Sequence, residues 1–331
     1  MLKLNTLSGF GSGAAAAGGA VPIYGYAGGG NSSGYGGETD RITFATSTTA
    51  AHTDADLSNT RGSMPSGISD TTTYGYYSGG YSSSASSSTD RLTFATSTTA
   101  AHTDADMPTA RYYLFGDSDG TTYGYITGGN NSVISDRLTF ATSTTAAYTD
   151  GDLTWETQGA LYNNDYNGTT ATYGYFAGGK GGDSPYDITH DSTQRRTYST
   201  GAIAAHTDAD LSVNTVYGGG WNDNTGTYGY FCGGGHWTPE TCIDTGNRIT
   251  FSTAVTAAHT DSNLATAVFG VGCVNDGAAY GYNIGGGDTD SYDTDVTQRL
   301  TYSTGVFAVH TDANAVAAAT QLCCGISDGW T

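Results

Sequence analysis

Residues 74–104 read YGYYSGGYSSSASSSTDRLTFATSTTAAHTD, and close copies of this stretch occur six times in the chain. Each copy carries Tyr-Gly-Tyr, a Gly-Gly pair, Arg-x-Thr-aromatic and a Thr-Asp step. The period is 49 to 55 residues, as read from the first tyrosines, which are Tyr24, Tyr74, Tyr123, Tyr173, Tyr228 and Tyr280. A repeat that covers nearly the whole chain predicts one repeat architecture rather than two ordinary domains.

Four short strands are expected in each copy. In residues 74–80, two tyrosines fall on one face of a strand and glycine on the other, because side chains alternate in β-structure. The bare glycine face leaves room for a neighbouring sheet. Residues 91–96 alternate again, with Leu92 and Phe94 on one face. A third strand is expected from Thr98 towards His102, and the Gly-containing stretch before each Tyr-Gly-Tyr supplies a fourth strand and its turn. Four strands per fifty residues make one propeller blade.

The two ends of the chain complete one another. Residues 322–329 match the stretch that supplies the fourth strand, but no Tyr-Gly-Tyr follows them, and the first Tyr-Gly-Tyr has no such stretch before it. A ring must join its first and last blades to hide the sheet edges. The sequence therefore predicts an all-β, six-bladed propeller, closed by a blade that the two termini share.

The chain resembles the Kelch family of β-propellers, whose repeats place a Gly-Gly pair after one strand and an aromatic residue on the next. The pairs here are Gly28-Gly29, Gly79-Gly80, Gly128-Gly129, Gly178-Gly179, Gly233-Gly234 and Gly285-Gly286, and the aromatics are Phe44, Phe94, Phe140, Tyr198, Phe251 and Tyr302. Kelch repeats usually carry a Trp on the outer strand, where this chain has His-Thr-Asp, so it is Kelch-like. The recurrent sequence Asp-Arg-Leu-Thr-Phe-Ala-Thr and the first residues of the chain also resemble sequences of Kelch-like structural proteins of tailed marine bacteriophages.

Composition and charge limit which partners the chain can bind. Fifty glycines and 25 tyrosines in 331 residues suit an all-β chain with many turns. A net charge of −20, with only 11 Lys and Arg residues, would repel nucleic acid and anionic membranes, so neither is expected as a partner. No segment approaches the roughly 20 apolar residues that cross a bilayer, so membrane insertion is not expected. The five cysteines have no metal-ligand spacing and are expected to be buried free thiols.

We divide the chain into an N-terminal anchor and linker, residues 1–21, and a propeller, residues 22–331. The beginning lacks the unbroken apolar core of a signal peptide, so synthesis in a host cytoplasm without standard export is expected. Leu2, Leu4, Leu7 and Phe10 alternate loosely with polar residues ahead of a Gly-Ala linker. Residues 1–20 are therefore expected to bind other particle proteins.

One His, one Arg and one Asp recur in almost every copy, and a feature present once per blade indicates structure rather than catalysis. The histidines are His52, His102, His206, His259 and His310, with Tyr148 in the third copy. We expect structural ion pairs between Arg41, Arg91, Arg137, Arg195, Arg248 or Arg299 and Asp54, Asp104, Asp150, Asp208, Asp261 or Asp312, because a guanidinium can bind a carboxylate with two hydrogen bonds. Metal ligation by the His-x-Asp pairs is the alternative.

Signals for a cofactor or for catalysis are weak. Asp288, Asp290, Asp293 and Asp295 are candidate calcium ligands, or simply a solvated acidic loop, and no other cofactor is expected. There is no Gly-x-Ser-x-Gly elbow and no phosphate-binding loop. Some Kelch-type propellers are copper oxidases, for which Cys232, His236 and Trp237 could serve only superficially. We therefore expect no enzymatic activity and no catalytic residue.

The loop after the Gly-Gly pair is the informative asymmetry, because loops on a rigid scaffold are where recognition is usually placed. It is short in copies one to three, and in copies four to six it gains Tyr186, His190, His236, Trp237, Glu240 and Tyr292. Aromatic residues beside carboxylates and hydroxyls are typical of a sugar-binding surface, and the alternative is that they pack the loops themselves.

Three functions follow as hypotheses. The first is a non-enzymatic virion protein on the particle surface, in a tail, fibre or capsid, used for assembly or for attachment to a host-surface glycan. The second is a carbohydrate-binding adhesion module that uses the loops of copies four to six. The third is a propeller enzyme, either an oxidase or a glycan hydrolase.

Overall fold

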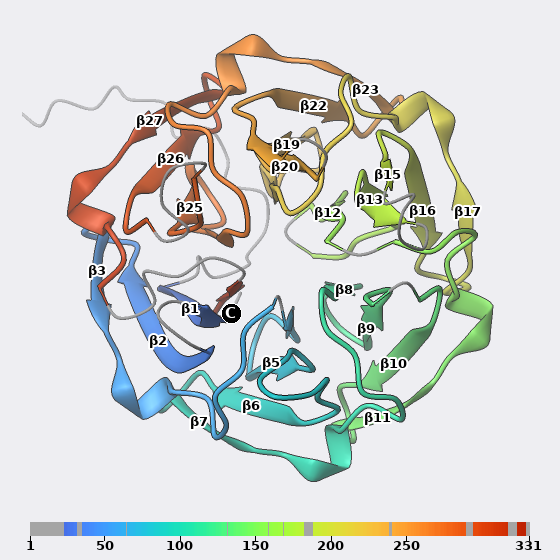
Figure 1. Cartoon of the computed structure of the whole chain (residues 1–331), viewed down its shortest axis with the longest axis vertical. Helices are drawn as coiled ribbons and strands as arrows, with labels where there is room; N and C mark the ends of the chain where they lie inside the picture. Colours follow the sequence, from blue (N-terminus) through green and yellow to red (C-terminus); the bar gives the residue numbers. More distant parts are fainter. Residues whose placement is uncertain are drawn as a thin grey trace, which may run out of the picture.

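The computed structural model is a ring of six four-stranded antiparallel sheets (Figure 1). It describes residues 23–31, 35–63, 65–130, 132–157, 159–167, 169–181, 188–237, 240–288, 294–316 and 323–328. Blade 1 contains β28, β1, β2 and β3, and blades 2 to 6 follow in chain order. The predicted six-bladed propeller is confirmed.

Every blade is built from four strands in the same order, from the centre outwards. The inner strands are β28 (Cys324–Ser327), β4 (Ser66–Ser69), β8 (Phe115–Ser118), β12 (Leu161–Asn164), β18 (Gly219–Asn222) and β24 (Gly272–Asn275). The second strands are β1 (Tyr24–Asn31), β5 (Tyr74–Ser78), β9 (Tyr123–Thr127), β13 (Tyr173–Ala177), β19 (Tyr228–Cys232) and β25 (Tyr280–Ile284). The third strands are β2 (Tyr35–Thr43), β6 (Thr89–Thr93), β10 (Ser135–Thr139), β16 (Thr193–Thr197), β22 (Gly246–Thr250) and β26 (Thr297–Thr301). The outer strands are β3 (Thr48–Ala51), β7 (Thr98–Ala101), β11 (Thr144–Ala147), β17 (Ile203–Ala205), β23 (Val255–Ala258) and β27 (Val306–Val309).

Short elements connect and extend the blades. A 3-10 helix follows each outer strand: η1 (Thr53–Ala55), η2 (Thr103–Ala105), η3 (Thr149–Gly151), η4 (Thr207–Ala209), η5 (Thr260–Ser262) and η6 (Thr311–Ala313). Two extra hairpins follow the Gly-Gly pairs of blades 4 and 5, namely β14 (Lys180–Gly181) with β15 (Ile188–Thr189) and β20 (Gly235–Trp237) with β21 (Glu240–Cys242).

Blade 1 closes the ring as the sequence predicts. Strand β28, from the end of the chain, pairs antiparallel with β1, with Tyr26 opposite Ile326. The carboxylate of Asp328 then accepts hydrogen bonds from the backbone N–H groups of Ile23 and Tyr24, at 2.7 and 2.8 Å. In blade 2 the carboxylate of Asp70 makes the equivalent bonds to the two residues before β5 and to Tyr74. The closure therefore copies an ordinary blade turn without the covalent connection.

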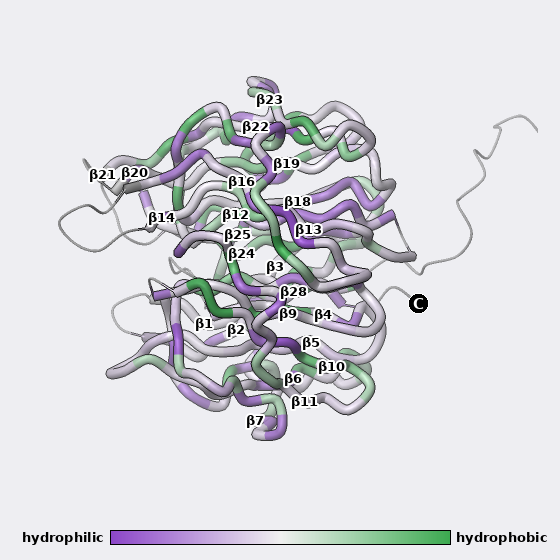
Figure 2. The backbone as a smooth tube through the Cα atoms, turned by 90° about the vertical axis from the view of Figure 1, so that its right-hand side faces the viewer, coloured by the Kyte–Doolittle hydropathy of each residue, from purple (hydrophilic) through white to green (hydrophobic). Residues whose placement is uncertain are grey.

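The ring has two different faces. The turn face carries the turns from inner to second strands and from third to outer strands. The loop face carries the loops after the Gly-Gly pairs and the connections between blades, and the hairpin β20–β21 projects there (Figure 2). Ile23 and Asp328, at the two ends of the described chain, lie at the turn face.

The core lies between neighbouring blades. Ile68 and Tyr76 of blade 2 pack with Leu138 and Phe140 of blade 3, and the other blade pairs form similar clusters. A side chain added at Gly75 would meet Ile326 of blade 1 at 2.9 Å, so the glycine of Tyr-Gly-Tyr admits the neighbouring sheet as predicted. Burying a Leu or Ile side chain contributes about 1.5–3 kcal/mol, so the blades stabilise one another.

Candidate functional site

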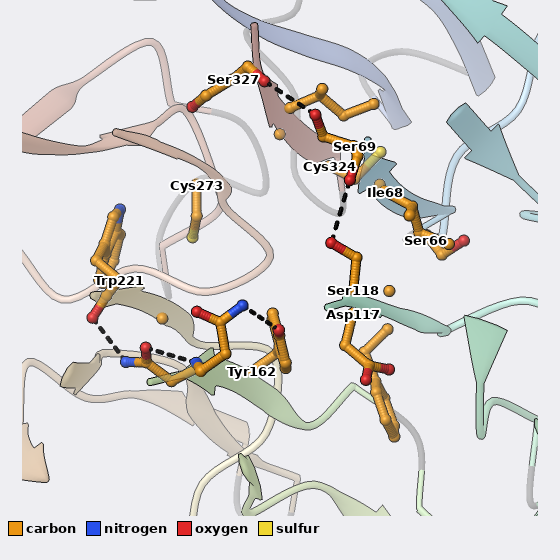
Figure 3. Close-up of a pocket in the computed structure, with 18 of the residues that line it drawn as sticks. Ser66, Ile68, Ser69, Asp117, Ser118, Tyr162, Trp221, Cys273, Cys324 and Ser327 are labelled. Carbon is orange, nitrogen blue, oxygen red and sulfur yellow. Dashed lines mark hydrogen bonds between the residues drawn. The ribbon is translucent and has the colours of Figure 1, made fainter. Parts of the chain in front are cut away.

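The six inner strands surround a central cavity of about 250 Å³ (Figure 3). Their last residues place a ring of hydroxyl and amide side chains around it: Ser69, Ser118, Asn164, Asn222, Asn275 and Ser327. This ring consists of neutral groups that both donate and accept hydrogen bonds. The cavity can therefore hold water or a small polar molecule.

Hydrogen bonds between blades hold the polar ring in place. Ser118 Oγ donates to the backbone oxygen of Ser69 at 3.1 Å, and Asn222 Nδ2 donates to Asn164 Oδ1 at 2.5 Å. The backbone N–H of Asn275 donates to Ser327 Oγ at 3.0 Å. These bonds join neighbouring blades, which favours a structural role for these side chains.

Glycine keeps the inner strands close together. Gly67, Gly116, Gly220 and Gly325 each occupy the second position of an inner strand. A Cβ at Gly220 would lie 1.8 Å from the backbone oxygen of Tyr162, and one at Gly116 would lie 2.5 Å from that of Gly67. Only glycine permits neighbouring inner strands to approach this closely, and the close approach narrows the central cavity.

A chain of backbone hydrogen bonds links five successive connections between blades at the loop face, around one end of the central cavity. Tyr113 N–H donates to Ser63, Gly159 to Tyr113, Tyr217 to Gly159, and Gly270 to Tyr217, at 2.6–3.1 Å between nitrogen and oxygen. All five residues have positive φ. The rings of Tyr113 and Tyr217, from connections two blades apart, meet with centroids 5.1 Å apart. The two rings therefore lie across the loop-face end of the central cavity.

A row of tyrosine rings leads outwards from this point over the loop face. Tyr113 contacts Tyr112, Tyr112 contacts Tyr81, and Tyr81 contacts Tyr35, with centroids 4.8, 5.0 and 5.4 Å apart. We call Tyr35, Tyr81, Tyr112, Tyr113 and Tyr217 the tyrosine row. Sequence reasoning missed it, although Tyr112, Tyr113 and Tyr217 are visible departures from the repeat pattern.

The predicted sugar-binding loops of copies four to six are described only in part. Tyr186 and Tyr292 lie outside the described residues. Trp237 and Glu240 are paired in the backbone register of β20–β21, and His236 is half-buried in the same hairpin. His190, also half-buried, directly follows β15, which lies beside β20. The structure thus brings His190 and the β20–β21 hairpin to the same part of the loop face.

The repeat arginines do not form the predicted ion pairs with the repeat aspartates. Each guanidinium lies over the ring of the first tyrosine of its own blade, 4.2–4.4 Å from the centroid, as in Arg41 over Tyr24 and Arg91 over Tyr74. The aspartates Asp54, Asp104, Asp150, Asp208, Asp261 and Asp312 are exposed in the 3-10 turns instead. A cation over an aromatic face is stabilised without a carboxylate.

Buried ion pairs occur instead between a connection and the blade that follows it. Arg61 pairs with Asp90 and Arg111 with Asp136, each arginine lying on the connection that precedes the blade of its aspartate. Where blade 5 has Asn247 in place of this aspartate, the arginine position holds Thr215. The aspartate and the arginine are thus replaced together, and this joint replacement was the sequence signal for the two ion pairs.

Three of the repeat histidines, His52, His206 and His310, each contact a backbone oxygen of the next blade. His52 Nε2 lies 3.0 Å from the backbone oxygen of Ser97, and His310 Nε2 lies 3.2 Å from that of Ser47, each in the next blade. Tyr148 replaces the histidine and donates its hydroxyl to the backbone oxygen of Thr200 at 2.7 Å. These contacts agree with the structural interpretation of the repeat position.

One ion pair breaks the repeat pattern. Arg196 occupies a core position that holds Leu or Ile in the other blades, and its Nε donates to Asp117 Oδ2 at 2.9 Å, with both side chains fully buried. The guanidinium also donates to the Gly201 backbone oxygen and Thr127 Oγ1. Burial raises the pKa of Asp117 to about 6, and Arg196 opposes this shift. The pair joins blades 3 and 4.

The metal and thiol candidates do not converge in the described part of the chain. Asp288 is half-buried and Asp295 is exposed, whereas Asp290 and Asp293 lie outside the described residues. Within the described ranges, no group of three or more His, Cys, Asp or Glu side chains is arranged to hold a metal ion. Burial raises the pKa of the Cys273 and Cys323 thiols to about 12, so both stay protonated at neutral pH. All five cysteines are free.

No protein-family model matches the chain, and no curated protein sequence matches it. Among the described residues, no helix has the length and apolar character needed to cross a membrane. The anchor residues Leu2, Leu4, Leu7 and Phe10 lie outside the described residues.

Proposed function

We propose that this chain is a non-enzymatic structural protein of a tailed-phage particle, which displays a rigid Kelch-like propeller on a tail, a fibre or the capsid surface. The observation that carries the proposal is the opposition of the two faces. The described chain starts and ends at the turn face, whereas the extra hairpins of blades 4 and 5 extend from the loop face. A protein attached through its ends would present the variable loops outwards.

The repeated contacts between blades also support a display role. The histidine contacts and the inner-strand glycines recur around the ring, which makes the scaffold rigid. Rigid scaffolds lower the entropic cost of binding through their loops. The repeat sequence resembles sequences of phage structural proteins, and this resemblance is the reason for proposing a phage particle.

A carbohydrate-binding adhesion module is the second candidate. It is favoured by the position of His190 and His236 on adjacent hairpins of the loop face. In this case Trp237→Ala weakens sugar or cell binding, and Trp155→Ala leaves it unchanged.

Immunogold electron microscopy tests the proposed particle role. Antibody raised against residues 22–331 should label the phage particles. Label at tail or fibre tips favours host attachment, and label over the shell favours decoration or assembly. Particles without label would overturn the virion role and leave the adhesion module as the better proposal.

A further inference from the structure

The tyrosine row is built from departures from the repeat. At the position of Tyr81, after the Gly-Gly pair, other blades carry Gly30, Asn130, Lys180, Gly235 and Gly287. At the position of Tyr112, three other connections carry Gly62, Val216 and Phe269. The propeller therefore folds without tyrosine at these positions, and the row requires an explanation other than the blade structure.

Two members of the row adopt unfavourable backbone conformations. Tyr113 and Tyr217 have φ of 57° and 61°, where the matching residues are Ser63, Gly159 and Gly270. A bulky residue at positive φ is uncommon, because its Cβ is crowded by the backbone. Strain of this kind costs about 1–3 kcal/mol and tends to cluster at functional sites. A tyrosine kept where glycine or serine would suffice indicates that its ring is needed.

The rings become more accessible away from the central cavity. Tyr217 is buried, Tyr113, Tyr112 and Tyr81 are half-buried, and Tyr35 is 40% exposed. The buried end is fixed by its neighbours, including Phe269 and Val216. The outer three rings are thus supported from below and present their edges and faces to solvent from blades 1 and 2 and the connection to blade 3.

The surroundings of the outer rings are polar but carry no accessible positive charge from the nearby arginines. Arg61 and Arg111, on the two connections beside the row, are buried and paired with Asp90 and Asp136. Ser83 and Ser84 on the loop of blade 2, and Asn59 on the connection beside Tyr35, are exposed. With a net charge of −20 on the chain, an anionic ligand would be repelled here.

We propose that Tyr35, Tyr81 and Tyr112 form a binding site for a neutral glycan chain. The apolar faces of sugar rings stack on tyrosine rings, which are rigid and amphipathic, and the serine and asparagine side chains bond to sugar hydroxyls. This site lies on blades 1 to 3, apart from the loops of copies four to six. The site rests on the proposed function in one respect, because the display role implies that its ligand is a host-surface glycan.

Binding is tested on the purified full-length protein by isothermal titration calorimetry. The probes are maltohexaose, cellohexaose and mannohexaose as neutral chains and hexagalacturonate as a matched anionic chain. We expect saturable binding of at least one neutral chain. Tyr81→Ala and Tyr112→Ala should each lower the affinity at least tenfold, and Tyr112→Phe, which keeps the ring, should retain most of it.

Trp155→Ala is the matched control, since Trp155 is a half-buried aromatic residue on the connection between blades 3 and 4, outside the row. Its affinity should equal that of the parent protein. Thermal unfolding of each variant separates loss of binding from loss of fold, and Ala is expected to be tolerated where other blades carry Gly. Absence of binding to all three neutral chains, equal affinity of the Tyr81→Ala variant, or preference for hexagalacturonate would overturn the site. None of these results bears on labelling of the particle.

Discussion

Arg196 and Asp117 form a buried ion pair at a place where most other blades use apolar side chains. The matching pair between blades 2 and 3 is Ile68 and Leu138, which pack in one apolar cluster. The guanidinium of Arg196 also donates hydrogen bonds to Gly201 and Thr127, whereas Asp117 Oδ1 is buried without a hydrogen-bond partner among the described residues. The pair is therefore tolerated rather than required. Replacing a buried ion pair by apolar residues of similar volume is often neutral or stabilising by about 1–4 kcal/mol.

We therefore expect the double substitution Asp117→Ile with Arg196→Leu to leave the free energy of unfolding unchanged or to raise it. Arg196→Leu alone should lower it by about 3–5 kcal/mol, because it leaves a buried carboxylate without its partner. Urea unfolding of the parent, the single variant and the double variant measures both effects. A double variant as unstable as the single one would show that the ion pair is needed for packing.

Measuring the unfolding of the parent and the double variant at several pH values isolates the contribution of the Asp117 carboxylate to stability. The folded-state pKa of Asp117 is about 6, above its ordinary value of 3.8. A group whose pKa is raised on folding favours the folded state below its unfolded pKa, and this contribution is lost as pH rises through about 6. Stability of the parent should therefore gain more than that of the double variant when pH falls from 8 to 5.

Residue roles were only partly predictable from the sequence. The Tyr-Gly-Tyr pattern and the core face of Leu92 and Phe94 follow from alternation, and the structure confirms them. The partner of the repeat arginine was not predictable, because Tyr, His and Asp all recur with the same period. Periodicity shows that two residues belong to the same blade position, but it does not show which of them meet. The tyrosine row was missed for the opposite reason, since it joins residues that do not repeat.

At the scale of elements, the closing strand β28 differs from the other inner strands in one respect. Asp328 binds the N–H groups of residues more than 300 positions away, whereas Asp70 binds within a single turn. The closure was predictable from the two incomplete copies at the ends of the chain. Its strength was not, because it depends on hydrogen bonds that only the folded ring brings together.

Asp328→Ala should loosen blade 1 more than Asp70→Ala loosens blade 2. The lost hydrogen bonds to a charged group are worth about 1.5–3 kcal/mol each at most in both cases, but only the turn at Asp70 remains covalently closed. Hydrogen exchange should therefore accelerate in residues 24–28 and 324–327 of the first variant. In the second, β4 and β5 should stay protected. Equal exchange in the two variants would mean that side-chain packing alone holds the ring shut.

At the scale of the whole molecule, the ring separates the two ends of the described chain from the tyrosine row. Both ends of the described chain lie at the turn face, and the tyrosine row lies at the loop face with the extra hairpins. The six blades stabilise one another through clusters that each span two blades. The propeller should therefore remain folded when residues outside the ring are removed.

Deleting residues 1–20 tests this separation. The shortened protein should unfold at the same temperature as the full chain, because the strands that form the six described blades lie within residues 24–327. It should also bind neutral hexasaccharides with unchanged affinity, yet fail to enter particles when it replaces the full-length protein in an infected host. Tyr81→Ala is the reciprocal control, since it should enter particles normally and lose binding. Incorporation of the shortened protein at the normal level would contradict the anchor, because attachment would then have to come from the propeller itself.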